Sequence, residues 1–334
     1  MKKTLSLLGA AAAFMLAFSS CGQEKAIVGG DDEEQVAAEY SVSVLKGPTA
    51  MGMAKLIEES RNNESFNSYD VTIHGTADEI SAGVISGSTD IACIPANLAA
   101  IMYKKTEGAV NVCAVNTLGV LYVVTAGEDI STVEDLRGRT IYSTGKGTTP
   151  EYVLNYILRQ NGLEPQKDVI IEYKSEASEC AALMAESENA AAVLPQPYVA
   201  AAMAKNDKLS ISLSLTEEWA RVCDTPMITG VTIAQKSVIE KNPEAFSIFM
   251  EEYAASVDYV NANTDEAAAI IGSLDIVSEA VAKKALPYCN ITLLKNEEMK
   301  TAVNGYWNVL FEADPASVGG AVPDEGVFYT ENEE

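Results

Sequence analysis

The sequence is poor in the residues from which active sites are usually built. Its 334 residues include one histidine, His74, and no Cys-x-x-Cys pair. A Ser-His-Asp or Cys-His arrangement would need His74, and zinc sites with several histidines are excluded. The carboxylates are abundant but scattered over predicted helix faces, where solvation explains them. We therefore expect neither a catalytic site nor a cofactor or metal site.

Cysteine is also sparse. The cysteines that remain once Cys21 is set aside are Cys93, Cys113, Cys180, Cys223 and Cys289. An odd number without close spacing is not a disulfide framework. Cys93 and Cys113 lie in apolar, strand-like runs, where we expect small buried hydrophobes. A bridge between these two stays open as the alternative.

Positive charge is scarce. The chain has 23 Lys and Arg against 48 Asp and Glu, a formal net charge of −25. Such a surface repels nucleic acid and anionic lipid, and no basic patch offsets it. Beyond the N-terminal segment no run of about 18 apolar residues appears, so no membrane span is expected there.

The N-terminus reads as a secretory signal. Lys2 and Lys3 precede an apolar run over residues 5–18, and two serines then precede Cys21. This is the order of a signal peptide over residues 1–20. A cysteine directly after small residues resembles a bacterial lipoprotein box, so we expect Cys21 to carry acyl chains such as palmitate; ordinary cleavage is the alternative. Residues 21–39 then form an acidic, flexible tether.

The chain contains one loose internal repeat. Residues 41–49 and 139–149 each run from a short strand through Gly and Thr into a helix. Each is followed by a second strand, a second helix and a third strand that ends in Pro, at residues 95 and 195. The repeat predicts two similar β-α-β-α-β lobes with a cleft between them.

The predicted fold is therefore α/β with two lobes joined by a two-segment hinge. Lobe 1 comprises residues 40–127 and 228–334, with covering helices after residue 243, and lobe 2 comprises residues 128–227. The chain is expected to cross from one lobe to the other near residues 125–130 and again near residues 226–230.

Ligand contacts are expected in the turns after the strands. Residues 144–151 form a Gly-rich turn, but Gly147 follows Lys146 where a nucleotide-binding loop needs Ser or Thr. What remains is a helix start that presents backbone N–H groups. Open α/β sheets bind ligands at the carboxyl ends of their strands, although any one such residue can simply cap a helix. The candidate ligand-binding residues are Gly47, Pro48, Thr49, Ala50, Asn97, Lys146, Gly147, Thr148, Thr149, Ser175, Glu176, Gln196 and Tyr198. His74 ends a strand, where it is either held by a backbone partner or faces the cleft.

Six segments carry a resemblance to a known family. They are Cys21 and residues 46–49, 87–97, 135–138, 145–151 and 194–198. Over residues 40–310 the chain resembles the type II periplasmic solute-binding proteins of ABC importers, in the branch for nitrate, sulfonate, taurine and thiamine precursors. A yeast-type relative makes the thiamine pyrimidine from its own histidine at a cysteine-rich iron site. One histidine and no cysteine cluster depart from that pattern.

The resemblance implies a monomeric, non-enzymatic lipoprotein, anchored on the extracytoplasmic face of the cell membrane. It would capture a small solute and deliver it to an ABC permease and its ATPase. The alternatives are an enzyme on the same scaffold, which would change its ligand chemically, and a sensor or adhesion lipoprotein.

Two classes of solute fit the turns. Lys46 and Lys146 beside helix starts suit a compact oxyanion, whereas Tyr142, Tyr173 and Tyr198 could stack on a polar heteroaromatic ring. The sequence favours the ring slightly, because the net negative charge opposes an anion.

Overall fold

The computed structural model describes residues 36–127 and 129–331, and from Ala38 onward these residues form one compact unit. The predicted signal peptide, Cys21 and the tether up to residue 35 lie outside the described residues. Among the described helices, none has both the length and the apolar composition that a membrane crossing requires.

The first sheet has six strands in the order β11-β4-β10-β3-β1-β2. They are β1 (Glu39–Leu45), β2 (Ser68–His74), β3 (Ile91–Pro95), β4 (Val110–Leu118), β10 (Ile228–Gln235) and β11 (Ile291–Leu294). β1 pairs in parallel with β2 and β3, and β10 runs antiparallel between β3 and β4. β3 is buried along its whole length, as its run of apolar residues predicts for a central strand.

The second sheet has five strands in the order β7-β6-β8-β5-β9. They are β5 (Leu121–Ala126), β6 (Thr140–Ser143), β7 (Ile170–Tyr173), β8 (Ala190–Pro195) and β9 (Leu209–Ser214). β6 pairs in parallel with β7 and β8, and β5 runs antiparallel between β8 and β9. The parallel core β2-β1-β3 of the first sheet thus has its counterpart in β7-β6-β8, as the repeat predicts.

In each sheet, the antiparallel strand β10 or β5 follows a strand of the other sheet along the chain. β5 follows β4 of the first sheet, and β10 follows β9 of the second. The first crossing therefore lies at Gly119 and Val120, before β5, and the expected position near residues 125–130 is wrong. β5 pairs with β8 and β9, and its apolar sequence does not reveal to which sheet it belongs.

Helices follow most strands. The first group is α1 (Pro48–Gly52), α2 (Ala54–Arg61), α3 (Ala77–Ser86) and α4 (Ala96–Lys105), beside the first sheet. The second is η1 (Val133–Leu136), α5 (Thr149–Gln160), α6 (Ala177–Glu186), α7 (Tyr198–Met203) and α8 (Leu215–Val222). The N-cap of the 3-10 helix η1 is Thr132, which forms a capping box with Asp135.

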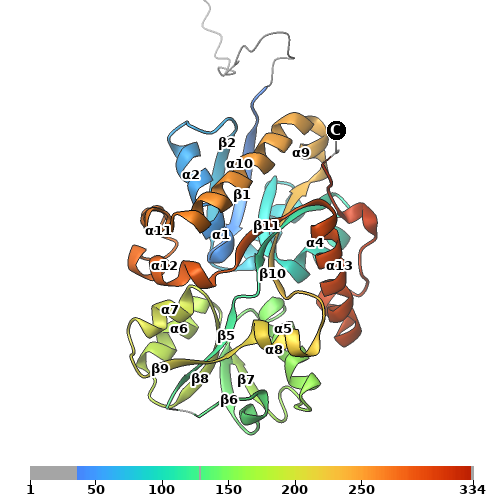
Figure 1. The fold of residues 1–334 in the computed structure, drawn as a ribbon. Helices are drawn as coiled ribbons and strands as arrows, with labels where there is room; N and C mark the ends of the chain where they lie inside the picture. Colours follow the sequence, from blue (N-terminus) through green and yellow to red (C-terminus); the bar gives the residue numbers. More distant parts are fainter. Residues whose placement is uncertain (1–35, 128, 332–334) are drawn as a thin grey trace, which may run out of the picture. The chain divides into compact units, whose positions relative to one another are not determined.

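The chain after β10 is helical, as its apolar spacing predicts. Its elements are α9 (Lys236–Lys241), α10 (Pro243–Ala262), α11 (Thr264–Ser273), α12 (Glu279–Ala285), η2 (Leu286–Tyr288) and α13 (Asn296–Ala313). Two short 3-10 helices, η3 (Pro315–Val318) and η4 (Glu325–Val327), punctuate an irregular C-terminal strap. α13 packs against α4 and also reaches α5 of the second sheet (Figure 1).

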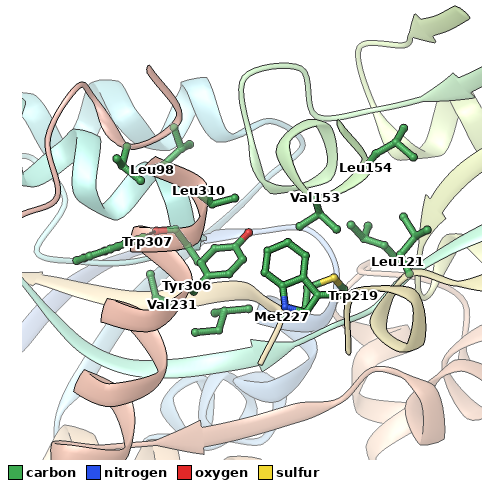
Figure 2. Close-up of a cluster of buried hydrophobic side chains, with 14 of the residues drawn as sticks. Leu98, Leu121, Val153, Leu154, Trp219, Met227, Val231, Tyr306, Trp307 and Leu310 are labelled. Atoms are coloured by element: carbon green, nitrogen blue, oxygen red, sulfur yellow. Dashed lines mark hydrogen bonds between the residues drawn. The ribbon is translucent and has the colours of Figure 1, made fainter. Parts of the chain in front are cut away.

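The largest apolar core is shared by the two sheets. Figure 2 shows Trp219 of α8 facing Tyr306 of α13, with Met227 of the second crossing and Val153 of α5 beside them. Trp219 and Tyr306 are both almost completely buried. Burial of apolar surface is the dominant favourable term in folding, and large rings bury much of it. This cluster therefore joins the sheets by packing as well as by covalent connections.

Cys93 and Cys113 are buried and free, and so are Cys180 and Cys289. Burial raises the pKa of the Cys93 thiol to about 11, so this side chain is neutral at physiological pH. The expectation of small buried hydrophobes is confirmed, and the alternative of a Cys93–Cys113 bridge is wrong.

Candidate functional site

A cavity of about 390 Å³ lies between the two sheets. Its walls are the carboxyl ends of strands and the turns that lead into the following helices. The first sheet supplies the turn 45–49 after β1, the turn 75–78 after β2, and Pro95, Thr117 and Thr229. The second supplies residues 144–150 after β6, the turn 174–177 after β7, and residues 195–198 after β8, except for residues 147, 176 and 197.

The turn after β1 is shaped by its backbone. Gly47 has φ 141°, a conformation that side chains with a Cβ rarely adopt. The Thr49 hydroxyl donates to the carbonyl oxygen of Leu45 at 2.6 Å. Thr49 therefore reaches the cavity with its hydroxyl hydrogen already used, and its oxygen is left to accept.

The turn after β6 is held by bonds within itself. Gly145 and Gly147 have φ 71° and 77°. The Thr148 hydroxyl donates to the carbonyl oxygen of Gly145 at 2.7 Å, and the Gly147 N–H donates to the Glu151 carboxylate at 2.5 Å. The Thr148 side chain makes no capping bond to α5.

Two helices present uncapped starts to the cavity. α3 and α6 begin at Ala77 and Ala177, which both line it. Their N-cap residues, Thr76 and Glu176, make no capping bond with their side chains. First-turn N–H groups without a cap are donors that carry partial positive charge.

Three buried side chains add donors from the second sheet. Gln196 is 3% exposed, Thr144 8% and Tyr198 9%, and all three line the cavity. Gln196 Oε1 accepts from the Ala200 N–H at 3.3 Å. Within the described ranges, no protein acceptor binds Gln196 Nε2 or the hydroxyl hydrogens of Thr144 and Tyr198. Burial, and then the Glu176 carboxylate, raises the pKa of Tyr198 to about 12, so its phenol keeps its proton at neutral pH.

The charged side chains that line the cavity are mostly cationic. They are Lys46, Lys146 and Lys174 against one carboxylate, Asp78. Lys146 Nζ lies 6.0 Å from the ring centre of Tyr173, and Lys174 Nζ lies 4.9 Å from that of Tyr142. These two tyrosines do not line the cavity; their rings lie beside lysines instead.

The cavity brings together nine of the predicted residues. Those that line it are Gly47, Pro48, Thr49, Lys146, Thr148, Thr149, Ser175, Gln196 and Tyr198. Ala50, Asn97, Gly147 and Glu176 do not. Ala50 is buried in the core of the first sheet, and Asn97 and Gly147 bond to each other. Glu176 is exposed, with its carboxylate beside Gly75.

The turn after β2, residues 75–78, was missed by sequence reasoning. The repeat itself could have found it, because this turn corresponds to the Ser175 turn after β7, which was selected. Thr144, Lys174 and Thr229 were also missed. Thr229 lies within the strand β10 rather than in a turn, so a search for turn residues does not find it.

His74 lies outside the cavity lining. Its Nδ1 is 3.5 Å from the Glu79 carboxylate. Its Nε2 is buried, and no described residue bonds to it. The partner is thus a carboxylate rather than the backbone, and the interpretation as a cleft-facing ligand is wrong. In the described part of the chain, no group of three or more His, Cys, Asp or Glu is arranged to hold a metal ion.

Comparisons with known proteins identify a family and structures that are similar to this chain. A sequence model of the family described as NMT1/THI5 like matches residues 67–267, more than half of the chain. A solved ABC transporter structure from Parabacteroides distasonis is 25% identical, with a TM-score of 0.72 over 88% of this chain and 99% of that one. No curated protein sequence matches.

Two more distant structures share the fold. The periplasmic aliphatic sulphonate-binding protein SsuA from Escherichia coli is 15% identical, with a TM-score of 0.67 over 89% of this chain and 95% of that one. The periplasmic nitrate-binding protein NrtA from Synechocystis PCC 6803 is 12% identical, with a TM-score of 0.62 over 84% of each chain.

Proposed function

Because the chain belongs to the NMT1/THI5-like family, we propose that it is the solute-binding component of an ABC importer, which captures a small solute between its two sheets and delivers it to a permease. The observation that carries the proposal is the cavity, with donors from both sheets turned into it. Small-solute sites are concave and orient their ligand through a few polar groups. Homology to solute-binding proteins of ABC importers agrees with this role.

The chemistry of the lining supports binding rather than catalysis. The lining offers hydroxyls, one amide, three lysines and the carboxylate of Asp78, and His74 lies outside it. A hydrolytic site would need a nucleophile next to a base that a third group orients. We therefore propose that the solute leaves the cavity chemically unchanged.

Of the two solute classes, we propose the compact oxyanion. Three lysines and the uncapped starts of α3 and α6 attract negative charge. The aromatic interpretation is weaker, because of Tyr142, Tyr173 and Tyr198 only Tyr198 lines the cavity. The net charge of −25 opposes an anion only at long range, since the Debye length at physiological salt is about 8 Å.

We further propose that acylated Cys21 anchors the protein to the extracytoplasmic face of the membrane as a monomer. The acidic body has no other affinity for lipid. A tether that ends before Ala38, where the compact unit begins, would leave the cavity free to meet the permease.

A ligand screen tests the proposed function. Thermal unfolding is followed with inorganic oxyanions, small organic sulfonates and uncharged pyrimidines, because a ligand of the native state raises the melting temperature. We expect stabilisation by a compact oxyanion. Stabilisation by pyrimidines alone would overturn the oxyanion class and leave the binding role intact, whereas processing of every stabilising compound would contradict the binding role.

A further inference from the structure

Asn97 joins three segments that are far apart in the sequence. It lies in the first turn of α4 and is completely buried. Its Nδ2 donates to the carbonyl oxygen of Gly147 at 3.3 Å and to that of Ser317 at 3.0 Å. Its Oδ1 accepts from the Thr149 hydroxyl at 3.5 Å. One side-chain amide therefore links the first sheet, the turn after β6 of the second sheet, and the C-terminal strap.

The hydrogen-bonding capacity of this amide is well used. A primary amide has two N–H hydrogens, and here each has a carbonyl partner. A buried polar group that loses its partner destabilises the arrangement that buries it. Separation of the two sheets at this point would leave the Gly147 carbonyl oxygen and one Asn97 hydrogen without partners until water replaced them.

The same contact bears on the cavity. Gly147 sits between Lys146 and Thr148, which line the cavity, and Thr149 both lines it and bonds to Asn97. Gly147 has a positive φ, and its N–H donates to Glu151 while its carbonyl oxygen accepts from Asn97.

We propose that Asn97 is a positioning residue that holds the cavity-lining turn 145–149 against the first sheet and so sets the equilibrium between closed and open arrangements of the two sheets. The relevance of this equilibrium to transport rests on the proposed function. The equilibrium itself can be measured without any solute, so failure of one idea does not imply failure of the other.

The chain supplies a matched control in Asn111. This residue of β4 is also buried, and its Nδ2 donates to the carbonyl oxygen of Gly326 in the strap at 3.0 Å. That bond ties the strap to the first sheet without touching the second. Asn111→Ala therefore removes the same chemical group and a strap contact, but no link between the sheets.

The test is a spin-label distance measurement on the full chain without added solute. Labels are attached through non-natural amino acids at Ala82 on α3 and Glu172 on β7, both exposed, so that native cysteines are not modified. We expect Asn97→Ala to add a population with a longer separation and Asn111→Ala to reproduce the parent distribution. An unchanged distribution in Asn97→Ala, or equal broadening in both variants, would overturn the proposal.

A second variant covers a failure of Asn97→Ala to fold, which circular dichroism would reveal. Thr149→Val has nearly the same volume and removes the hydroxyl that bonds to Asn97 and also lies beside the phenol of Tyr306. We expect a smaller shift in the same direction, because the bonds to Gly147 and Ser317 remain. A parent-like distribution in this variant together with an unfolded Asn97→Ala would count against a positioning role.

Discussion

The indole ring of Trp219 lies 5.6 Å from the phenol ring of Tyr306, centre to centre. Trp219 belongs to α8, beside the second sheet, and Tyr306 to α13, which also packs on the first (Figure 2). Tyr156 of α5 extends this ring cluster, with its ring centre 4.9 Å from that of Trp219. The two sheets therefore share an apolar core, and any opening of the cavity has to leave this contact intact or slide along it.

Removal of the Trp219 ring should destabilise both sheets together. We expect Trp219→Ala to lower the free energy of unfolding by about 3–5 kcal/mol, the usual cost of a large buried ring. Trp219 Nε1 also donates to the Thr225 carbonyl oxygen at 2.7 Å, so Trp219→Phe should cost less but still about 1 kcal/mol. Urea unfolding followed by fluorescence and by circular dichroism measures both. Separate transitions for the two probes would contradict a shared core.

Removal of the buried amide of Gln196 should weaken solute binding. Gln196→Met keeps the shape of the side chain but loses the Nε2 donor, and loss of one such bond costs about 1–3 kcal/mol, or roughly 5- to 150-fold in Kd. Calorimetry with the solute identified in the screen measures this. Gln160→Met, at an exposed position on α5, is the control and should bind like the parent. Equal affinities for all three proteins would place the solute elsewhere.

Stability should fall at alkaline pH. Burial is the main cause that raises the pKa of both Tyr40 and Tyr198 to about 12, from an ordinary value of about 10. Below about pH 10 both states keep these protons, and as the pH rises towards 12 the unfolded chain releases them first. The free energy of unfolding should therefore decrease between about pH 10 and pH 12. Tyr198→Phe should make this decrease shallower; an equally steep decrease would show that Tyr198 does not contribute.

The anchor is tested separately. Cys21→Ser should release the protein from the membrane fraction, because the proposed attachment is through acyl chains on Cys21 and an acidic surface is repelled by anionic lipid. Fractionation of cells that produce the parent and the variant measures this. Sedimentation of the variant with membranes would show that another part of the chain provides the attachment.

The repeat predicts most of the fold because each copy carries Gly, Pro or Thr at its strand-to-helix turns. The turns that hold Gly47 and Gly145 need backbone conformations that glycine adopts most readily, so the positions of these turns can be predicted from the sequence. The helices after residue 243 show their buried faces through apolar spacing. The sheet to which β5 belongs could not be predicted, because an apolar strand can be buried in either sheet. Its membership follows from its pairing with β8 and β9, which the sequence does not record.

The candidate site is predicted at the level of turns but not of single side chains. Neighbours in one turn point in different directions, so Lys146 lines the cavity whereas Gly147 turns its carbonyl towards Asn97. Tyr142 and Tyr173 lie near the right turns, yet their rings lie beside Lys174 and Lys146. These directions depend on contacts between the two sheets, which no local pattern records.

The central claim is that one small solute binds in the cavity between the sheets and is left unchanged. Native mass spectrometry of the protein, purified gently from its own host, tests it most directly. We predict a single small molecule bound one to one, released with the mass it had on entry, and lost from a Gln196→Met, Lys174→Met double variant. Retention of the same molecule by the double variant, or release of a chemically altered product, would contradict the account.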